Sequence, residues 1–484
     1  MSAFFGLYIA RSGMMAHQRA MEVTGHNIAN ANTPGFSRQQ AIMQAGTPFP
    51  YPSANAPAGA PGQLGTGVQV AMIRRVRDSF LDHQLRNEYG TLNYWDARRD
   101  VLSQIETIFM EPSEFGLSNL LNEFWDAWHE MSKNPESLPV RISLREKAQA
   151  LTDTVQLMYN NLGSLKEGIA LDISSRVSEI NSMAVQIRDL NEQIVKVTAL
   201  GQQPNDLADQ RDLILDKLSQ YIDITVSHTP SGTVSVFTNS RPLVQDSQIF
   251  ALKAIVNTNN AEVVWERNDY AVTLRSGELN ALLKAYNDFI PSYQGNLDTL
   301  VTALVEKVNE VHQGGVNLND LINEVDPAIF SSYNFFAPID PTEFPASLFF
   351  RLSEEVAADV NNIAAASFDP GNPEEIGPAD GSNALNIARL RTNLTMHGNS
   401  TTFEGYYQNI IARLGVEGEE AGRIQNLQNQ IVSALEYRKE QASGVSLDEE
   451  MINLVQFQYS YQAAAKLVAT MDEMLDVLIN RTGR

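Results

Sequence analysis

The side chains most suited to chemistry are seven histidines, and their spacing argues against a metal site. They occupy positions 17, 26, 83, 129, 228, 312 and 397, without the regular separation of paired metal ligands. His129 precedes Glu130, but no second histidine follows four residues on, so the pair lacks the zinc motif of metalloproteases. We therefore expect no metal centre.

Four aspartates form the other candidate cluster. Asp206, Asp209, Asp212 and Asp216 recur at helical spacing, but no EF-hand glycine or ligand loop accompanies them. This pattern favours a solvated or capping helix face over a calcium site. The segment 65–67 has two of the three glycines of a dinucleotide-binding loop and precedes a strand-like run instead of a helix. Since no nucleophile motif or carboxylate pair can be named either, we expect neither catalytic residues nor a cofactor.

Composition excludes several classes of protein. The chain has 484 residues, 43% of them hydrophobic, which is enough for about three domains with real cores. A net charge of −23 argues against partners that are nucleic acids or anionic membranes. No apolar run approaches the roughly 18 residues of a membrane span, and no cleavable signal is visible at the start. The absence of cysteine excludes disulfides and thiolate chemistry, and is compatible with a chain that crosses into an oxidising space unfolded.

The final stretch, 446–484, predicts one long amphipathic helix. Ser446 and Glu449 have the spacing of a capping box, and no glycine or proline follows before Gly483. Such a helix is roughly 50 Å long, which is too long for the interior of one ordinary domain. Its apolar stripe consists of Leu447, Met451, Leu454, Tyr461, Ala465, Val468, Leu475 and Ile479.

The first 31 residues predict a second amphipathic helix. Its stripe consists of Phe4, Leu7, Met14, Met21 and Ile28. Residues 1–38 carry a net charge of +2 and residues 446–484 carry −3, so the two termini are electrostatically complementary. We therefore expect the two ends of the chain to pair as a helical hairpin. A terminal helix docked on its own domain is the alternative.

A turn ends the first helix, because Pro34 and Gly35 both disfavour its continuation. Three asparagines precede the turn, and their types suggest capping of the helix end. The motif that carries a resemblance consists of Asn27, Asn30, Asn32, Thr33, Pro34, Gly35 and Phe36. With its neighbours up to Arg38 it resembles the N-terminal signature of rod, hook and hook-associated proteins of the bacterial flagellum.

The middle of the chain predicts a mainly α, α+β fold. Residues 46–67 hold five prolines and five glycines, which indicates an extended connector followed by a strand-like run over 68–73. Arg74, Arg75 and Arg77 form a basic cluster for which we expect salt bridges, or else a solvated face. From 80 to 221 the pattern is helical with breaks near Pro112 and 135–139, and a heptad stripe over 144–194 predicts one very long helix. Three aromatic residues before that helix are expected in the core, namely Phe124, Trp125 and Trp128.

The second half of the chain predicts β-structure carried by helices. Residues 222–237 predict a hairpin, and short strands are expected over 241–244, 249–252, 263–265 and 271–274. Helices are expected over about 278–312 and 382–442, with an irregular outer lobe between them over 313–380. The expected layout is a coiled-coil assembly domain of 1–40 with 446–484, a connector over 41–79, a long-helix bundle of 80–220 with 381–445, and a β-rich outer insertion over 221–380.

Two further segments narrow the resemblance. The motif Phe124-Trp125-x-Ala127-Trp128 and the run 204–212 are similar to the first hook-associated protein family, the hook-filament junction proteins, and the C-terminal segment 443–476 matches as well. The resemblance implies a structural, secreted subunit that is exported through the flagellar type III apparatus and bound by a cytoplasmic export chaperone. It also implies assembly as a ring on the hook protein, next to the following hook-associated protein.

Terminal helices that cannot bury both faces alone are expected to stay loose in the monomer and to order against neighbouring subunits. Two alternatives remain at this stage. The third hook-associated protein would share the helical termini, and a flagellar-type scaffold with an enzymatic outer domain would need a cluster of titratable residues within 222–380. We expect no nucleic-acid binding and no membrane insertion.

Overall fold

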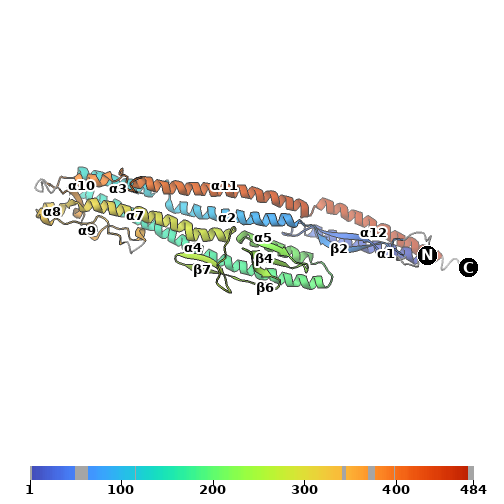
Figure 1. Ribbon diagram of the computed structural model, residues 1–484. Helices are drawn as coiled ribbons and strands as arrows, with labels where there is room; N and C mark the ends of the chain where they lie inside the picture. The colour runs from blue at the N-terminus through green and yellow to red at the C-terminus, as the bar shows by residue number, and fades with distance from the viewer. Residues whose placement is uncertain are drawn as a thin grey trace.

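The computed structural model describes residues 3–49, 64–114, 116–340, 345–368, 376–396 and 398–477. The molecule is long and narrow, and the two termini lie together at one end (Figure 1). Long helices run along its length and carry small antiparallel sheets, which confirms the predicted mainly α, α+β fold. Among the described residues, no helix has the length and apolar character needed to span a membrane.

Long helices form the framework of the molecule. They are α2 (Ser79–Phe109), α3 (Leu117–Lys133), α4 (Leu138–Ala199), α5 (Asn205–Tyr221), α7 (Ile290–Gln313) and α11 (Phe403–Ser443). The predicted very long helix is α4, with 62 residues. Its heptad positions between Leu144 and Ile194 are almost all buried, because α3, α5 and several β-strands pack along it.

The helix ends follow local chemistry. The Asp78 side chain accepts hydrogen bonds from the amides of Phe80 and Leu81 and so caps α2. Pro139 occupies the first turn of α4, where its missing N–H costs nothing. The predicted breaks near Pro112 and over 135–139 are confirmed. The turn between α4 and α5 at Gly201, which has a positive φ of 75°, was outside the prediction.

Two small sheets lie beside α4 and α5. A four-stranded antiparallel sheet contains β3 (Thr225–His228), β4 (Val234–Thr238), β5 (Arg241–Gln245) and β6 (Gln248–Ile249). A separate hairpin contains β7 (Leu252–Asn257) and β8 (Asn260–Trp265). The hairpin predicted over 222–237 is confirmed by the pairing of β3 with β4.

Two predicted strands are wrong. Residues 271–274 do not form a strand, and residues 249–252 do not form a single one. Ala271 forms a single bridge to Val264, and the amide of Val272 donates to the carbonyl of Val263 at 2.7 Å, but the pairing does not extend to a strand over these residues. Val272 and Leu274 are buried on the body. The alternation that suggested a strand therefore reflects packing on the core. In the other case β6 ends at residue 249 and β7 begins at residue 252, so the predicted run straddles a strand break.

The helix predicted over 278–312 is confirmed, with one irregular turn. It consists of α6 (Glu278–Lys284), a π-helical turn over Ala285–Phe289 and α7. The chain then forms short elements at the end of the molecule opposite the termini (Figure 1). They are β9 (Gly315–Asn317), α8 (Leu318–Ile322), α9 (Glu354–Ala358) and β10 (Ala364–Ser367), with 3-10 turns at Pro327–Ile329, Ala346–Leu348 and Val360–Asn362.

These short elements belong to the main core, which corrects the expectation of a separate outer lobe over 313–380. Phe335 and Phe336 are fully buried and lie against Phe124, at ring distances of 6.0 and 5.8 Å. Trp128 lies 4.9 Å from Phe335. The three aromatic residues predicted in the core are thus confirmed there. Within 221–380, which the sequence predicts as a β-rich insertion with a helix over about 278–312, the chain forms the small sheets, then α6 and α7, and then this distal segment (Figure 1).

One expected helix is broken. The prediction of a single helix over 382–442 is wrong, since α10 (Ser382–Arg389) and α11 are separate. Gly398 and Asn399 between them have positive φ angles of 66° and 68°, and Met396 pairs with Thr401 in a bridge. A left-handed backbone at two successive residues cannot continue a helix.

His312 connects these distal elements through its neutral imidazole. Its Nδ1 lies 2.8 Å from the carbonyl oxygen of Tyr333, and the amide of Ala364 donates to its Nε2 at 3.0 Å. The ring therefore donates through one nitrogen and accepts through the other, which requires the neutral form. Burial lowers the pKa of His312 to about 4 against the opposing effect of the Tyr333 hydrogen bond.

We predict a loss of stability on acidification that comes from His312. The folded state binds this proton later than the unfolded state, so the contribution is present above the ordinary pKa of 6.5 and is lost as the pH falls towards 4. The loss is about 3 kcal/mol. Thermal unfolding of His312→Gln should show a flatter dependence on pH between 7 and 4. The control is His129→Gln, which changes an exposed histidine and should leave the pH dependence of stability as it is in the natural protein. An unchanged pH dependence in His312→Gln would contradict the assignment.

Candidate assembly site

The two ends of the chain pair, as the complementary charges and heptads predict. Helix α1 (Ala3–Ala29) and helix α12 (Leu447–Asp476) lie antiparallel along their whole length (Figure 1). The Ser446 side chain accepts a hydrogen bond from the amide of Glu449, so the predicted start of the final helix is confirmed. We call α1, α12 and the ribbon described below the terminal rod, and the rest of the molecule the body.

Small side chains form the contact between the two helices. Gly6, Gly13, His17 and Asn27 of α1 contact α12, and the buried residues Ala10, Ala20 and Thr24 share their helical spacing of three or four residues. A Cβ atom at Gly6 would lie 2.5 Å from Cε of Met471, and one at Gly13 would lie 3.7 Å from Cβ of Ala464. The rings of His17 and Phe457 are 6.2 Å apart. Glycine and alanine at these positions allow the helix axes to approach closely.

The predicted stripe of α1 is offset by one residue from these positions. Leu7, Met14, Met21 and Ile28 each follow a contact position by one residue and are half-buried, whereas Phe4 is 65% exposed. In α12 the half-buried members of the predicted stripe are Leu454, Tyr461, Ala465, Val468 and Leu475. Leu447 and Met451 are exposed, and Ile479 lies outside the described residues.

An antiparallel ribbon covers another face of α1. It contains β1 (Gln39–Ala45) and β2 (Val68–Arg75), with an irregularity in register at Ile42 and Met43. The expectation of an extended connector over 41–79 is thereby corrected, because its two ends pair as strands. The strand-like run over 68–73 is confirmed. The intervening residues 50–63 lie outside the described chain.

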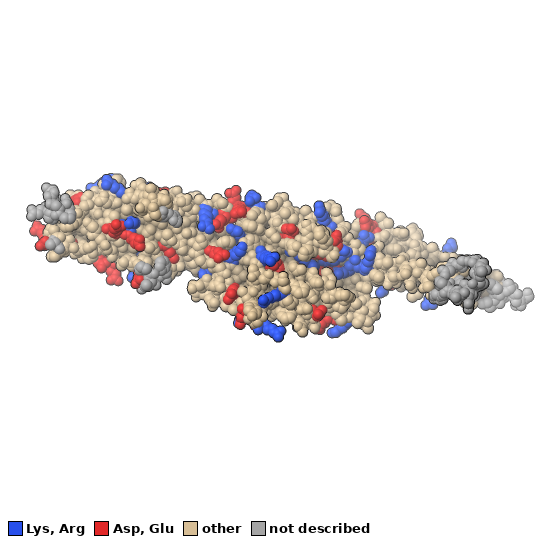
Figure 2. Space-filling view, in the orientation of Figure 1, with Lys and Arg blue, Asp and Glu red and all other residues tan. Residues whose placement is uncertain are grey.

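The outward face of α12 is apolar as well. Its exposed side chains recur at heptad-like spacing and are more than two-fifths accessible: Ile452, Tyr459, Leu467, Met474 and Val477. Residues 451–465 contain no charged side chain, and the visible face of the rod in Figure 2 carries few. We call these five residues the outer stripe. Among the described residues α1 covers the opposite side of α12, and this apolar surface is left in water.

Asn27 of the family motif links three segments at the base of the rod. Its Oδ1 accepts from the amide of Gln39 at 2.9 Å, and its Nδ2 donates to the Gln39 carbonyl at 2.9 Å and to Oε2 of Glu450 at 2.9 Å. The expectation that it caps the helix end is therefore wrong. Its amide instead joins α1 to the start of β1 and to α12.

The other motif residues shape the turn that follows α1. Asn30 does cap the helix, because its Nδ2 donates to the carbonyl of His26 at 3.0 Å. Thr33 donates to Oδ1 of Asn30, and the ring of Phe36 lies 5.4 Å from that of His26. Gly35 has a positive φ of 79°, and a Cβ atom there would lie 3.1 Å from the Leu213 side chain. Asn32 and Pro34 are exposed.

Arg38 fixes the base of α12. Its Nε donates to Oε1 of Glu450 at 2.8 Å and its Nη1 donates to Oε2 of Glu449 at 3.0 Å, while its amide donates to the carbonyl of Ser443 at 2.9 Å. Glu450 is only 2% exposed and is the one buried residue in the described part of α12. Glu449 thus binds Arg38 and does not complete the capping box.

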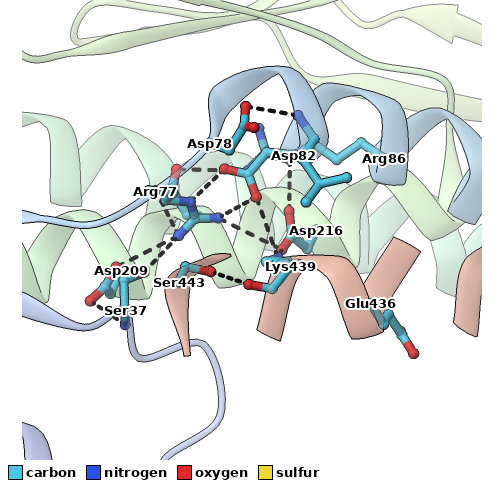
Figure 3. A network of polar contacts seen from close by, with 12 residues as sticks. Ser37, Arg77, Asp78, Asp82, Arg86, Asp209, Asp216, Glu436, Lys439 and Ser443 are labelled. Carbon is cyan, nitrogen blue, oxygen red and sulfur yellow. Dashed lines mark hydrogen bonds and ion pairs between the residues drawn. The ribbon is translucent and has the colours of Figure 1, made fainter. Parts of the chain in front are cut away.

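A cluster of arginines and aspartates joins the ribbon to the body (Figure 3). Arg75 lies 2.8 Å from both Asp209 and Asp212 of α5. Arg77 binds Asp82 of α2 through Nε and Nη2, and its Nη1 lies 3.1 Å from Asp212. The salt bridges expected for these two arginines are confirmed.

Two more cations complete this cluster from α2 and α11. Arg86 Nε lies 2.7 Å from Asp216, and Lys439 Nζ lies 2.8 Å from the other oxygen of that carboxylate. Asp209 and Asp212 are nearly inaccessible to water, so the expectation of a solvated aspartate face is wrong for them. Asp206 remains exposed and accepts from Gln39.

The charges in this cluster stabilise one another. Burial alone would raise the pKa of the Asp212 carboxyl, but Arg77, Arg75 and Arg86 outweigh it and lower this pKa to about 2. Burial opposes the charge on Arg77, yet Asp212 and Asp82 raise its pKa above the ordinary value. In the described part of the chain, no group of three or more potential ligands is arranged for a metal ion. The aspartates thus serve as partners of arginines.

Two features of the sequence indicate the contact face between α1 and α12, although the stripes of large apolar residues do not include them. Four small residues of α1 are separated by four, three and seven residues, which is the spacing of a helix contact face: Gly6, Ala10, Gly13 and Ala20. Glu450 is a charge in line with the apolar residues Leu454 and Tyr461. A charge at a contact position requires a buried partner, which the structure supplies as Arg38 and Asn27.

The chain matches three models of flagellar proteins. Residues 102–328 match the model of the flagellar hook-associated protein FlgK helical domain. Residues 7–36 match that of the flagella basal body rod protein, and residues 440–481 match that of the flagellar basal body rod FlgEFG protein C-terminal region. The last two matches coincide with α1 and α12.

Whole-length relatives agree with these models. Flagellar hook-associated protein 1 of Bacillus subtilis (strain 168) is 32% identical over 100% of this chain and 99% of its own. The protein of the same name from Escherichia coli (strain K12) is 25% identical over 97% and 98%. The flagellar hook junction protein FlgK from Burkholderia pseudomallei has a similar fold, with a TM-score of 0.63 at 16% identity over 75% of this chain and 100% of that one.

We predict that Asp212 is the most sensitive residue of the arginine and aspartate cluster. Asp212→Asn keeps the shape but leaves Arg75 and Arg77 short of a buried counter-charge, and should cost about 3–5 kcal/mol of folding free energy. Asp206→Asn removes a charge from the same helix at an exposed position and should cost less than about 1 kcal/mol. Denaturant unfolding followed by circular dichroism compares the two. Equal effects would contradict the role given to Asp212.

Proposed function

Because this chain belongs to the flagellar hook-associated protein 1 family, it is a structural subunit of the bacterial flagellum, and we propose that it forms the junction between hook and filament. The observation that carries this proposal is the terminal rod, in which α12 has apolar side chains on two opposite sides and a partner helix on only one. We infer that neighbouring subunits cover the second side.

Burial energetics support assembly through the outer stripe. An exposed apolar side chain of this size gains roughly 1.5–3 kcal/mol when it is fully buried, and the stripe contains five of them. The depletion of charge over residues 451–465 resembles the core of a protein interface. The predicted assembly residues of α1, from Phe4 to Ile28, lie on the other helix of the rod, and we propose that they form a separate contact with a neighbouring subunit.

Assembly through this surface would also limit polymerisation in free solution. The pair α1 and α12 has a narrow contact of small side chains, and neither helix contributes to the hydrophobic clusters of the body in the described residues. Such a pair is marginal by itself and gains stability when a neighbour covers its second side. We therefore propose that folding of the terminal rod and incorporation into the flagellum are coupled.

Family membership extends the proposal to partners and route. We propose that the subunits form a ring that contacts the hook protein on one side and the next hook-associated protein on the other. Export through the flagellar type III apparatus as an unfolded chain, with a cytoplasmic chaperone on the C-terminal region, would bring the protein to the cell exterior. A chain without cysteine suits this route, since it forms no disulfide on the way.

We propose that the role is structural and not catalytic. The densest group of titratable side chains, around Asp212, is occupied by ion pairs that join the rod to the body. The third hook-associated protein, the alternative within the flagellum, would share the terminal helices. The match of residues 102–328 to the FlgK helical domain favours the first hook-associated protein over it. We also propose that the chain has two functional parts. The terminal rod makes the assembly contacts, and the body supports the rod.

We predict that polar substitution of the outer stripe abolishes incorporation without unfolding the chain. The triple variant Ile452→Ser, Tyr459→Ser and Leu467→Ser should be exported in normal amount and yet fail to restore filaments in a strain that lacks the gene. Electron microscopy should show hooks without filaments, with filament protein lost to the medium. Leu171→Ser, which changes a side chain of the body that is 74% exposed, should restore filaments fully. Normal filaments from the triple variant would contradict the proposal.

We predict that the rod of the monomer opens more readily than the body. Amides of residues 450–476 should exchange with solvent at least about tenfold faster than those in the middle of α4, because opening the rod exposes little buried surface. Hydrogen exchange followed by mass spectrometry measures both segments in one experiment. Equal protection would favour a final helix that is firmly docked on its own chain.

A further inference from the structure

The contact between α1 and α12 specifies the pairing of the two helices but not their register. The α1 positions Gly6, Gly13 and Ala20 are separated by seven residues and are all small. Sliding α12 by one heptad therefore again places a small residue of α1 opposite Ala464, although it separates the rings of His17 and Phe457. Contacts of this kind distinguish weakly between registers that differ by about 10 Å along the axis.

One contact is different from the others. At the base of the pair Asn27 faces Glu450, and these two polar side chains are 1% and 2% exposed. Both amide hydrogens and the carbonyl of Asn27 are used, on Glu450 and the Gln39 backbone. The Glu450 carboxylate receives a second hydrogen bond from Arg38. This group satisfies its charges only when Glu450 is opposite Asn27.

We propose that Glu450 and Asn27, with Arg38, lock the register of the α1 and α12 pair. A slide of one heptad in one direction places the Glu450 carboxylate opposite Ala20, where no polar group replaces Asn27. The opposite slide moves it beyond the end of α1, to the level of Pro34. Either slide leaves Asn27 without its third partner, and a buried polar group without a partner is costly. Single polar contacts have the same function in coiled coils.

The competing explanation is the short connection between α11 and α12. Helix α11 ends at Ser443 and α12 begins at Leu447, so only three residues join them. An extended segment of this length spans roughly 10 Å, which is the displacement that a heptad slide requires. The connection restricts sliding but does not by itself exclude it. The two explanations therefore differ in what happens when Glu450 is replaced.

The register determines the surface that the rod presents. A slide of one heptad would move the outer stripe of α12 by about 10 Å along the axis of α1, so the exposed side chains of the two helices would lie at different relative heights. This inference concerns contacts within one chain, and it stands whether or not the proposed junction function is correct.

Disulfide trapping reads the register directly, because the chain has no cysteine of its own. The native register is reported by Gly13→Cys with Ala464→Cys, since a Cβ atom at Gly13 lies 3.7 Å from Cβ of Ala464, within disulfide range. The two slipped registers are reported by Gly6→Cys with Ala464→Cys and by Gly13→Cys with Met471→Cys. Each pair is oxidised in the purified full-length monomer, and the crosslinked fraction is measured by gel mobility against time.

With Glu450 present, the native pair should crosslink at least about tenfold faster than either slipped pair. In the background Glu450→Leu the preference should fall to within about threefold. Glu449→Leu is the matched control, because it removes the same charge and another Arg38 contact at an exposed site next to Glu450. It should keep the native preference, as should Glu450→Gln, whose amide oxygen still accepts from Asn27.

Three results would overturn the proposal. A native preference that persists in Glu450→Leu would assign the register to the connection between α11 and α12. Equal crosslinking of all pairs with Glu450 present would mean that no register is fixed. Loss of every crosslink in Glu450→Leu, with helicity of the body retained by circular dichroism, would mean that Glu450 is needed for pairing itself and not for its register.

Discussion

The structure depends on one geometric constraint, which is that a pair of helices cannot enclose apolar side chains on both sides of one member. Helix α12 has small and apolar residues against α1 and a second apolar stripe that faces away from it. The body has no such problem, because α4 is surrounded by α3, α5, the sheets and the distal aromatic residues, which bury its heptad positions. The body therefore has one continuous core, whereas the described part of the rod leaves one apolar side of α12 exposed.

The connection between these two parts is polar. Among the described residues neither hydrophobic cluster contains a side chain of α1 or α12. The rod is held to the body instead by directional contacts. The amide of Arg38 donates to the Ser443 carbonyl of α11, and Arg75 and Arg77 form ion pairs with Asp209 and Asp212 of α5. Arg77 and Asp209 are shown with their neighbours in Figure 3. Hydrogen bonds and buried ion pairs fix orientation more sharply than apolar contact does, because they lose most of their energy when the geometry changes.

Sequence patterns predicted the features that depend on large apolar residues and on helix ends. The long helix α4, the aromatic core around Trp128, the capping of α12 by Ser446 and the pairing of the termini all follow from local spacing. The missed features depend on small residues or on distant partners. Large side chains such as Met14 suggested the contact face, whereas close approach selected Gly13 beside it. The position of Glu450 among apolar residues signals a buried charge, but its partner Asn27 could not be predicted, since it lies 423 residues away in the chain.

The most direct test of the central claim compares two tyrosines of α12 in assembled flagella. A photoreactive phenylalanine analogue is placed at Tyr459, on the outer stripe, or at Tyr461, which is half-buried beside α1. After irradiation of isolated flagella, the account predicts that position 459 yields covalent adducts between subunits and that position 461 yields links within one chain, to α1. Adducts between subunits from position 461 alone, with none from position 459, would contradict the claim that the outer stripe is the assembly surface.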